Sequence, residues 1–175
     1  MAMESKPHKD ADSGSNDGVT KSEDGKIIDL TPRKLSIVWG NDPRYWRSSS
    51  NPDAPVELIQ VSWLEVTGSY QLKKKSADYH ISFTVSLNPD AFGWNGCQVY
   101  VLAKLGKKGK YSWKRASLDQ SRSGQVFEIP PPDDPLKVTT ANDETIPMLY
   151  FGMYEVWSGK WKGGLKIHKV TIKEK

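Results

Sequence analysis

The side chains with the most chemical potential in this sequence are aromatic rings beside carboxylate and amide groups. Residues 35–46, LSIVWGNDPRYW, bring Trp39, Asp42 and Trp46 together in one short segment. Flat aromatic faces suit the C–H face of a sugar ring, a nucleobase or a peptide, while carboxylates and amides form hydrogen bonds with polar substituents at its rim. The segment reads as a short strand ending in a turn, so it predicts a binding surface carried on a loop.

Two further segments offer the same chemistry. Residues 92–96, FGWNG, place Asn95 in a second aromatic turn, and residues 154–162, YEVWSGKWK, contain Glu155, Trp161 and Lys162. Convergence of these loops would supply rings for sugar faces, donors for hydroxyl or N-acetyl carbonyl groups, and an apolar wall for a methyl group. The candidate binding residues are therefore Trp39, Asp42, Trp46, Asn95, Glu155, Trp161 and Lys162.

Catalytic and metal chemistry has less support. The three histidines, His8, His80 and His168, lack metal-ligand spacing, and Cys97 has no evident histidine partner. No two carboxyl groups are placed as glycoside hydrolysis requires. We therefore expect no enzymatic activity, no metal and no cofactor.

Sequence neighbours predict different environments for the tryptophans. Trp63 lies between Val61 and Leu64 in an apolar run and is expected in the core. Trp46 adjoins a polar loop and is expected to be exposed, whereas core and site positions stay equally open for Trp39.

The remaining tryptophans have less decisive surroundings. Trp113 is expected to be structural, covered by lysine and arginine stems. Trp157 and Trp161 frame a Ser-Gly-Lys turn, where one is expected to pack and the other to be open. Glu155 has a second interpretation as half of a surface ion pair with a lysine.

Short strands must position these loops. Residues 79–87 alternate apolar and polar side chains strictly, as a half-buried strand does. Turn-rich connections separate further predicted strands, and no segment has a sustained helical period. The pattern predicts an all-β, antiparallel, jelly-roll-like β-sandwich with little helix. The other expected strands are 26–30, 35–39, 56–70, 98–104, 111–118, 125–129, 147–156 and 165–172.

Composition divides the chain of 175 residues. Residues 1–25 contain no Trp, Tyr or Phe and are predicted to form a disordered polar tail before a domain spanning 26–175. The tail carries a net charge of −3, so the domain must carry +7 to give the overall charge of +4. One cysteine, no secretory signal and no long apolar run predict a cytoplasmic protein.

Four motifs together resemble the phloem lectins, the phloem protein 2 or Nictaba-like family of plants. The similarity spans roughly residues 30–172, although the proline-rich stretch 129–144 departs from the acidic segment expected there. The motifs are LSIVWGNDPRYW at 35–46, ELIQVSWLEVTG at 57–68, GWN at 93–95 and YEVWSGKWKGGLKI at 154–167.

The resemblance implies a lectin for N-acetylglucosamine oligomers, such as chitin fragments and the N-glycan core. It also implies a defence-related homodimer made without a signal peptide in the phloem companion-cell and sieve-element sap. Family binding residues correspond to Trp39, Trp46 and Glu155, and we extend the set to Trp161 and Lys162. On this reading the two tryptophans stack on sugar, Glu155 and Lys162 hydrogen-bond to it, and Asp42 and Asn95 order the loops or touch its rim.

Two alternatives stay open. A cationic module for single-stranded RNA would use the same rings to stack bases, and its affinity would fall steeply with salt. An interaction scaffold cross-linked through oxidised Cys97 would instead give reductant-sensitive oligomers.

Overall fold

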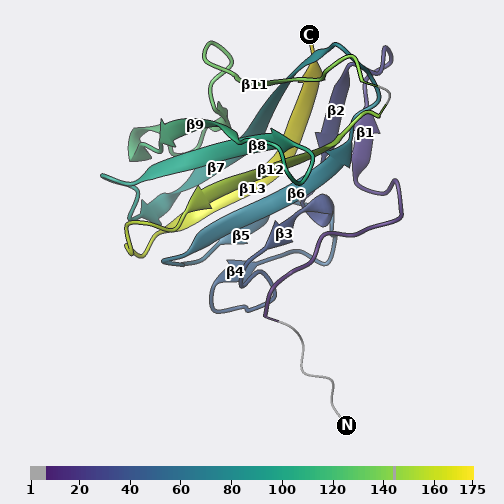
Figure 1. Ribbon diagram of the computed structural model, residues 1–175. Coiled ribbons are helices and arrows are strands. Elements are labelled where there is room, and N and C mark those ends of the chain that lie inside the picture. Colours follow the sequence, from purple (N-terminus) through teal and green to yellow (C-terminus); the bar gives the residue numbers. More distant parts are fainter. Residues whose placement is uncertain (1–6, 144) are drawn as a thin grey trace.

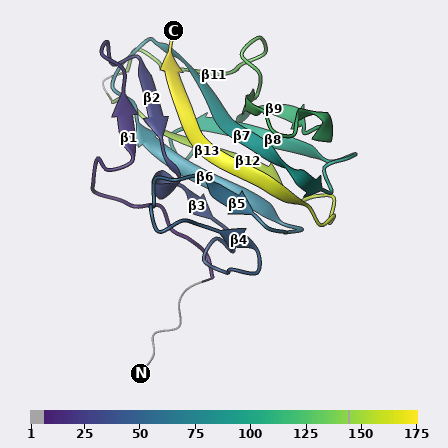
Figure 2. The same cartoon turned by 180° about the vertical axis from the view of Figure 1, so that it is seen from behind.

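Two antiparallel sheets lie face to face in the computed structural model, which describes residues 7–143 and 145–175 (Figures 1 and 2). β8, β12 and β6 lie in front in Figure 1, and β13 lies in front in the reverse view of Figure 2. The five-stranded sheet has the order β3 (Ser36–Ile37), β6 (Leu64–Gln71), β12 (Met148–Glu155), β8 (Gln98–Leu105), β9 (Ser112–Ser117). The eight-stranded sheet contains β1 (Val19–Lys21), β2 (Ile27–Leu30), β4 (Trp46–Arg47), β5 (Val56–Leu58), β7 (Asp78–Phe92), β10 (Val126–Ile129), β11 (Leu136–Thr139) and β13 (Gly163–Glu174).

The alternating strand predicted at 79–87 forms the middle of β7. Its apolar residues face the core, and residues 79–87 pair with β13 with one register shift between Ile167 and Lys169. Phe83 from β7 meets Phe151 from β12 edge to face at 6.1 Å between ring centroids, so the two sheets share one core. The prediction of an all-β antiparallel sandwich is confirmed, and in the described residues helix is limited to two 3-10 turns, Pro32–Lys34 and Gln120–Arg122. Within those same ranges no helix is long and apolar enough to cross a membrane.

The strand predicted over residues 56–70 is divided between the two sheets. β5 ends at Leu58, β6 begins at Leu64, and the chain crosses between the layers at Val61. Val61 is buried at the crossing, and a new in-and-out alternation begins with β6 at Leu64. Leu64 therefore faces the core, while Trp63 before it faces out with 47% of its surface exposed. The prediction that Trp63 is a core residue is wrong for this reason.

The segment before residue 26 lies along the domain rather than apart from it. β1 pairs with β2, and Lys9 donates to the carbonyls of Pro32 and Leu35 at 2.9 and 2.6 Å. Arg33 forms ion pairs with Asp12 and with acids beyond it. Polar and backbone contacts replace the apolar ones that the composition lacks, so the prediction of a disordered tail is wrong for residues 7–25; residues 1–6 lie outside the described part.

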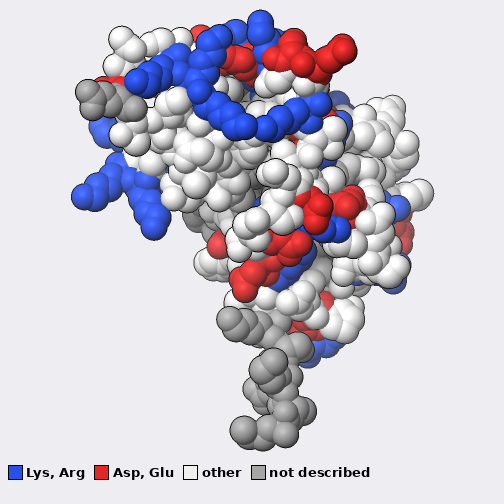
Figure 3. Space-filling model, turned by 90° about the vertical axis from the view of Figure 1, so that its right-hand side faces the viewer, with Lys and Arg blue, Asp and Glu red and all other residues white. Residues whose placement is uncertain are grey.

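Charged side chains are unevenly distributed over the surface. On the side shown in Figure 3, Lys and Arg gather over the upper end, while acidic and basic side chains interleave lower down. Interleaved charges of opposite sign offset one another. The charge of an individual surface region therefore indicates the charge of its ligand better than the overall +4 of the chain does.

Candidate functional site

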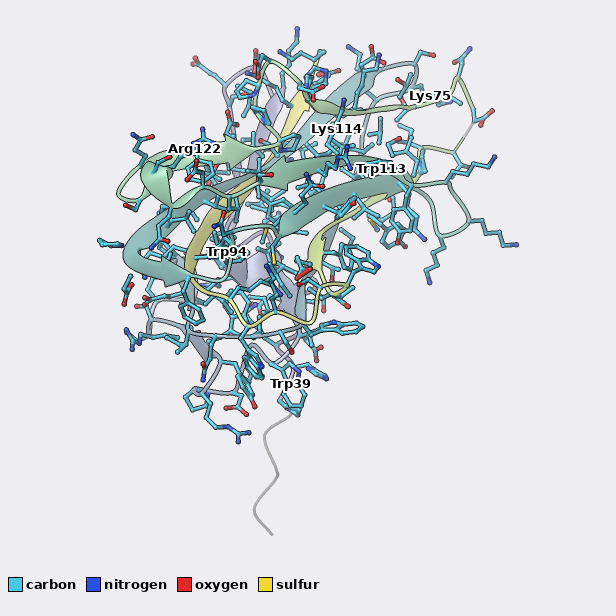
Figure 4. The ribbon with its side chains drawn as sticks, turned by 90° about the vertical axis from the view of Figure 1, so that its left-hand side faces the viewer. Trp39, Lys75, Trp94, Trp113, Lys114 and Arg122 are labelled. Atoms are coloured by element: carbon cyan, nitrogen blue, oxygen red, sulfur yellow. The ribbon has the colours of Figure 1, made fainter. Side chains whose placement is uncertain are left out.

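Three aromatic side chains from two loops lie in succession, and we call them the aromatic row: Trp39, the partly buried Tyr45, and Trp161. The ring centroids of Trp39 and Tyr45 are 5.7 Å apart with planes inclined by 61°, and those of Tyr45 and Trp161 are 6.4 Å apart with planes inclined by 30°. Trp39 is 37% exposed and Trp161 is 53% exposed. Figure 4 places Trp39 at the lower end of the domain in that view, away from Trp113 and Lys114 on β9.

The backbone turns sharply to bring Trp39 out of the core. Trp39 has a φ of 63°, a left-handed conformation that is costly for a bulky side chain. Hydrogen bonds hold it there: Gly40 N–H donates to Ile37 O, and Asp42 N–H donates to Trp39 O, both at 3.0 Å. The Trp39 N–H also donates to His8 Nδ1 at 2.9 Å. This strained turn redirects the side chain from the buried strand face of Ile37 to the surface.

Asp42 orders the loop that follows. Its carboxylate accepts hydrogen bonds from the Arg44 backbone N–H at 3.0 Å, from Nε at 3.1 Å and from Nη2 at 2.8 Å. These bonds from Arg44 hold the pKa of Asp42 below its usual value. The tethered guanidinium lies 5.1 Å from the Tyr45 ring centroid, so Asp42 helps to position the middle of the aromatic row.

Trp46 is a core residue. Only 3% of its surface is exposed, and it pairs with Leu58 across β4 and β5. Tyr45 immediately precedes β4 and is only partly buried, whereas Trp46, the next residue, faces inward. The prediction that Trp46 is exposed is wrong, and its buried Nε1 has no hydrogen-bond partner in the described residues.

A buried ion pair lies beneath the loop of residues 156–162. Lys162 Nζ and Glu155 Oε2 are 2.5 Å apart, and both side chains are almost fully buried. Lys162 Nζ also donates to Ser62 O at 2.8 Å and to Lys160 O at 3.0 Å, which uses all three ammonium hydrogens. The expected contact of Lys162 with sugar is therefore corrected to a positioning role.

Glu155 is held in its charged form by the same network. The Ser158 backbone N–H and hydroxyl each donate to its carboxylate at 3.0 Å. Burial alone would favour the neutral acid, but the hydrogen bonds from Lys162 and Ser158 outweigh it and lower the pKa of Glu155. The alternative interpretation of Glu155 as half of an ion pair with a lysine is confirmed, but the pair is buried and does not lie at the surface.

The anchored loop presents tryptophans in two directions. Trp161 stacks toward Tyr45, whereas Trp157 packs edge to face on Tyr100 at 4.9 Å. Both tryptophans are more than half exposed, so the prediction that one is packed and the other open is wrong. Trp157, Tyr100 and the mouth of the Glu155 site line an open cleft of about 670 Å³.

Asn95 lies on a loop whose backbone packs closely against the backbone of Trp161. Gly93, at φ 84°, approaches so closely that an added Cβ would lie 2.1 Å from Trp161 O. Trp94 Nε1 donates to Gly163 O at 3.0 Å, and Lys160 Nζ donates to Asn95 O at 3.0 Å. The Asn95 side chain itself is exposed beside this contact.

The structure thus assembles part of the predicted set. Trp39 and Trp161 belong to the aromatic row, Asp42 orders it, and Asn95 adjoins it. Trp46, Glu155 and Lys162 lie underneath as core or scaffold. The predicted set omits Tyr45, because Trp46 was expected to be exposed and only its burial in the structure indicates that the neighbouring Tyr45 lies on the other side. In the described ranges no three His, Cys, Asp or Glu side chains lie close enough together to hold a metal ion.

These features define an antiparallel β-sandwich with a row of aromatic side chains at its loop end. The chain matches the family model described as phloem protein 2 over residues 25–174, and it belongs to that family. It is 38% identical to Protein PHLOEM PROTEIN 2-LIKE A9 of Arabidopsis thaliana, with 99% of each chain covered. It is 33% identical to a lectin of Luffa acutangula over 42% of this chain and 39% of that one. Among solved structures, a Podospora anserina GH26-CBM35 β-(1,4)-mannanase aligns with a TM-score of 0.47 and 8% identity over 86% of this chain and 28% of that chain.

Proposed function

We propose that this protein is a non-catalytic lectin that binds N-acetylglucosamine oligomers across the aromatic row. The observation that carries the proposal is the open succession of Trp39, Tyr45 and Trp161 rings, 5.7 and 6.4 Å apart. Successive rings offer apolar faces to successive sugars of one chain. Membership of the phloem protein 2 family and the similarity to the Luffa acutangula lectin support the same function.

Each part of the site has a role in this proposal. The rings of Trp39 and Trp161 meet the C–H faces of the sugars, and the acetamido methyl group packs against Tyr45 between them. The exposed Asn95 amide offers a donor and an acceptor to the rim of the ligand. Glu155 and Lys162 act through the loop, because their buried ion pair fixes the position of Trp161.

An open site of this kind favours oligomers over single sugars. Each added residue meets further aromatic surface, whereas one ring buries little area against the row. Dimerisation, which stays a prediction, would add avidity for glycans that carry several such chains.

Titration calorimetry of the full chain with chitotriose, at low and at high salt, tests the proposal. We expect saturable binding that changes little with salt, because the ligand is neutral. Trp161→Ala should weaken it roughly tenfold, a loss of about 1.4 kcal/mol. The matched control is Trp113→Ala, which removes an equally exposed ring elsewhere and should leave chitotriose binding unchanged.

Two results would overturn the proposal. One is the absence of heat with any N-acetylglucosamine oligomer, from protein shown to be folded by circular dichroism. The other is equal loss of binding in Trp161→Ala and Trp113→Ala. A polyuridine oligomer in parallel titrations tests the RNA alternative, for which affinity would fall steeply as salt rises.

A further inference from the structure

The outward face of the five-stranded sheet carries a second group of aromatic side chains. Strand register places Tyr154 and Tyr150 on either side of Gly152 along β12, all three facing away from the core. Tyr100 lies beside Tyr154, and Lys104 lies beside Tyr150 on β8. This face is formed by regular strands, so its side chains have fixed relative positions.

A hollow of about 300 Å³ opens on this face between β6, β12 and Tyr111. Its walls include Tyr111, Tyr150, Tyr154 and Lys104, and Thr67 and Ser69 line the β6 side. Gly152 leaves room for the Tyr154 ring, since an added Cβ would lie 2.6 Å from that ring. The hollow is large enough for a sugar ring and offers both aromatic faces and hydroxyl partners.

Positive charge is concentrated around the hollow. Residues 98–117, which include β8 and β9, contain six Lys or Arg residues and no Asp or Glu, against +4 for the whole chain. Within the described residues only Lys114 of these six has a carboxylate partner, the exposed Asp134 at 2.7 Å. Two of these cations, Lys104 and Lys107, line the hollow and are available to an anionic ligand. One carboxylate lies on the same face, that of Glu65, which pairs with Tyr154 across the strands and accepts a hydrogen bond from Trp63 Nε1 at 3.1 Å.

Lys104 is the cation best placed for such a ligand. Its Nζ lies 4.7 Å from the Tyr111 ring centroid and 5.9 Å from that of Tyr150. It donates one hydrogen bond to Lys107 O at 3.0 Å, which leaves two ammonium hydrogens for a ligand. The aromatic rings orient the ammonium group without neutralising it.

We propose that this hollow is a second carbohydrate site, which binds an acidic sugar residue of the uronic acid class. The carboxylate of the sugar accepts hydrogen bonds from Lys104, its ring lies against Tyr150 and Tyr154, and its hydroxyls meet Thr67 and Ser69. The site shares none of these residues with the aromatic row, so its existence does not depend on the function proposed for that row.

A strip of aromatic rings begins beside the hollow, at Tyr100, the strand partner of Tyr154. Tyr100 is tilted against Trp113 at 5.7 Å and meets Trp157 edge to face at 4.9 Å. These three rings lie outside the lining of the hollow and pack on one another, so they are not separate plates between which bases could stack. Burial raises the pKa of Tyr154 to about 12, so its hydroxyl stays protonated and able to donate at neutral pH.

Titration calorimetry of the full chain with trigalacturonic acid tests this site. We expect Lys104→Gln to weaken binding about tenfold or more, since it removes a charged hydrogen bond. Lys107→Gln, an exposed change at the rim, should weaken it severalfold. The control is Lys137→Gln, which alters net charge equally at an exposed position of β11 and should leave the affinity unchanged.

Ligand controls make the outcome decisive. The fully methyl-esterified trimer, which lacks the negative charge, should bind at least about tenfold more weakly. Equal losses in Lys104→Gln and Lys137→Gln, equal affinity for the ester, or no binding at low salt would overturn the proposal. So would a polyuridine oligomer that displaces the uronate and depends equally on Lys104, because the face would then be a nucleic-acid surface. Titration of the Lys104→Gln variant with chitotriose tests the aromatic row separately, because Lys104 lies in the hollow and not in the row.

Discussion

The aromatic row and the hollow on the five-stranded sheet use similar rings in different electrostatic settings. At the row, Asp42 is tied to Arg44 and Glu155 to Lys162, so the charges are satisfied within the protein. Around the hollow, Lys104 has no carboxylate partner among the described residues. Aromatic content alone therefore does not define a ligand. Internal pairing of charge favours a neutral sugar at the row, and unpaired cations favour an acidic one at the hollow.

Trp46, in the core, and Trp161, in the row, provide a second contrast. Both belong to the predicted binding motifs, yet one is 3% and the other 53% exposed. We expect the first to contribute to stability and the second to the binding proposed for the row. Four changes test these distinctions, beginning with the largest expected effect.

Replacing Trp46 with Ala should destabilise the fold by about 3–5 kcal/mol, because it leaves a large cavity in the core. Trp46→Phe should cost far less, since it keeps most of the volume and removes an indole N–H that lacks a hydrogen-bond partner. Urea unfolding measures both. A Trp46→Ala protein with the original unfolding midpoint but no chitotriose binding would instead place Trp46 in the binding surface.

Lys162→Met should cost about 3–5 kcal/mol of unfolding free energy, because it leaves the Glu155 carboxylate buried without its partner. The double variant Glu155→Leu, Lys162→Met removes both charges and should recover much of that loss. Thermal and urea unfolding of the single and double variants measure the coupling. If the losses of unfolding free energy from the two single changes simply add in the double variant, Glu155 and Lys162 do not stabilise each other and the account of the loop is wrong.

Trp39→Gly and Trp39→Ala should weaken chitotriose binding equally, because both remove the ring. Gly should nevertheless be more stable than Ala by about 1 kcal/mol, since it adopts the left-handed conformation at φ 63° without steric cost. Calorimetry and urea unfolding give the two quantities. Equal stability of the variants would mean that the backbone at this position relaxes to an ordinary conformation.

Acidification should weaken the row only below the usual range of glutamate titration. The pKa of Glu155 is lowered in the folded protein, so its stabilising contribution is present above the unfolded-state pKa and is lost as pH falls through the folded value. Chitotriose affinity should therefore be constant from pH 7 to about 5 and decline below about 4. In Glu155→Leu, Lys162→Met the decline should diminish; an unchanged profile would assign it to another group.

The sequence predicted the architecture better than the site. Strict alternation at 79–87 located the middle of β7, because one face of that strand is buried and the other is not. Trp63 and Trp46 were misassigned because a sheet crossing and a two-residue strand decide which way they face. The order of residues 7–25 was missed because hydrogen bonds and ion pairs hold them, and composition does not reveal such partners.

Within the site, the residue types indicated which side chains matter, but their spacing in the sequence did not predict which of them are in contact. Glu155 and Lys162 were predicted to hydrogen-bond to sugar, but the structure shows that they form a buried ion pair with each other beneath the loop. The hollow was missed because its walls come from β6, β8, β12 and residue Tyr111, which converge only when the strands pair.

The most direct test of the two-surface account is to follow the seven tryptophan indole N–H signals and the tyrosine ring-proton signals by NMR during separate titrations. Chitotriose should shift the signals of Trp39 and Trp161, whereas trigalacturonic acid should leave both unchanged and shift the ring-proton signals of Tyr150 and Tyr154; the buried Trp46 and Trp94 should stay unchanged in both titrations. Shifts of the same signals by both sugars would contradict the account, because they would show one shared surface instead of two.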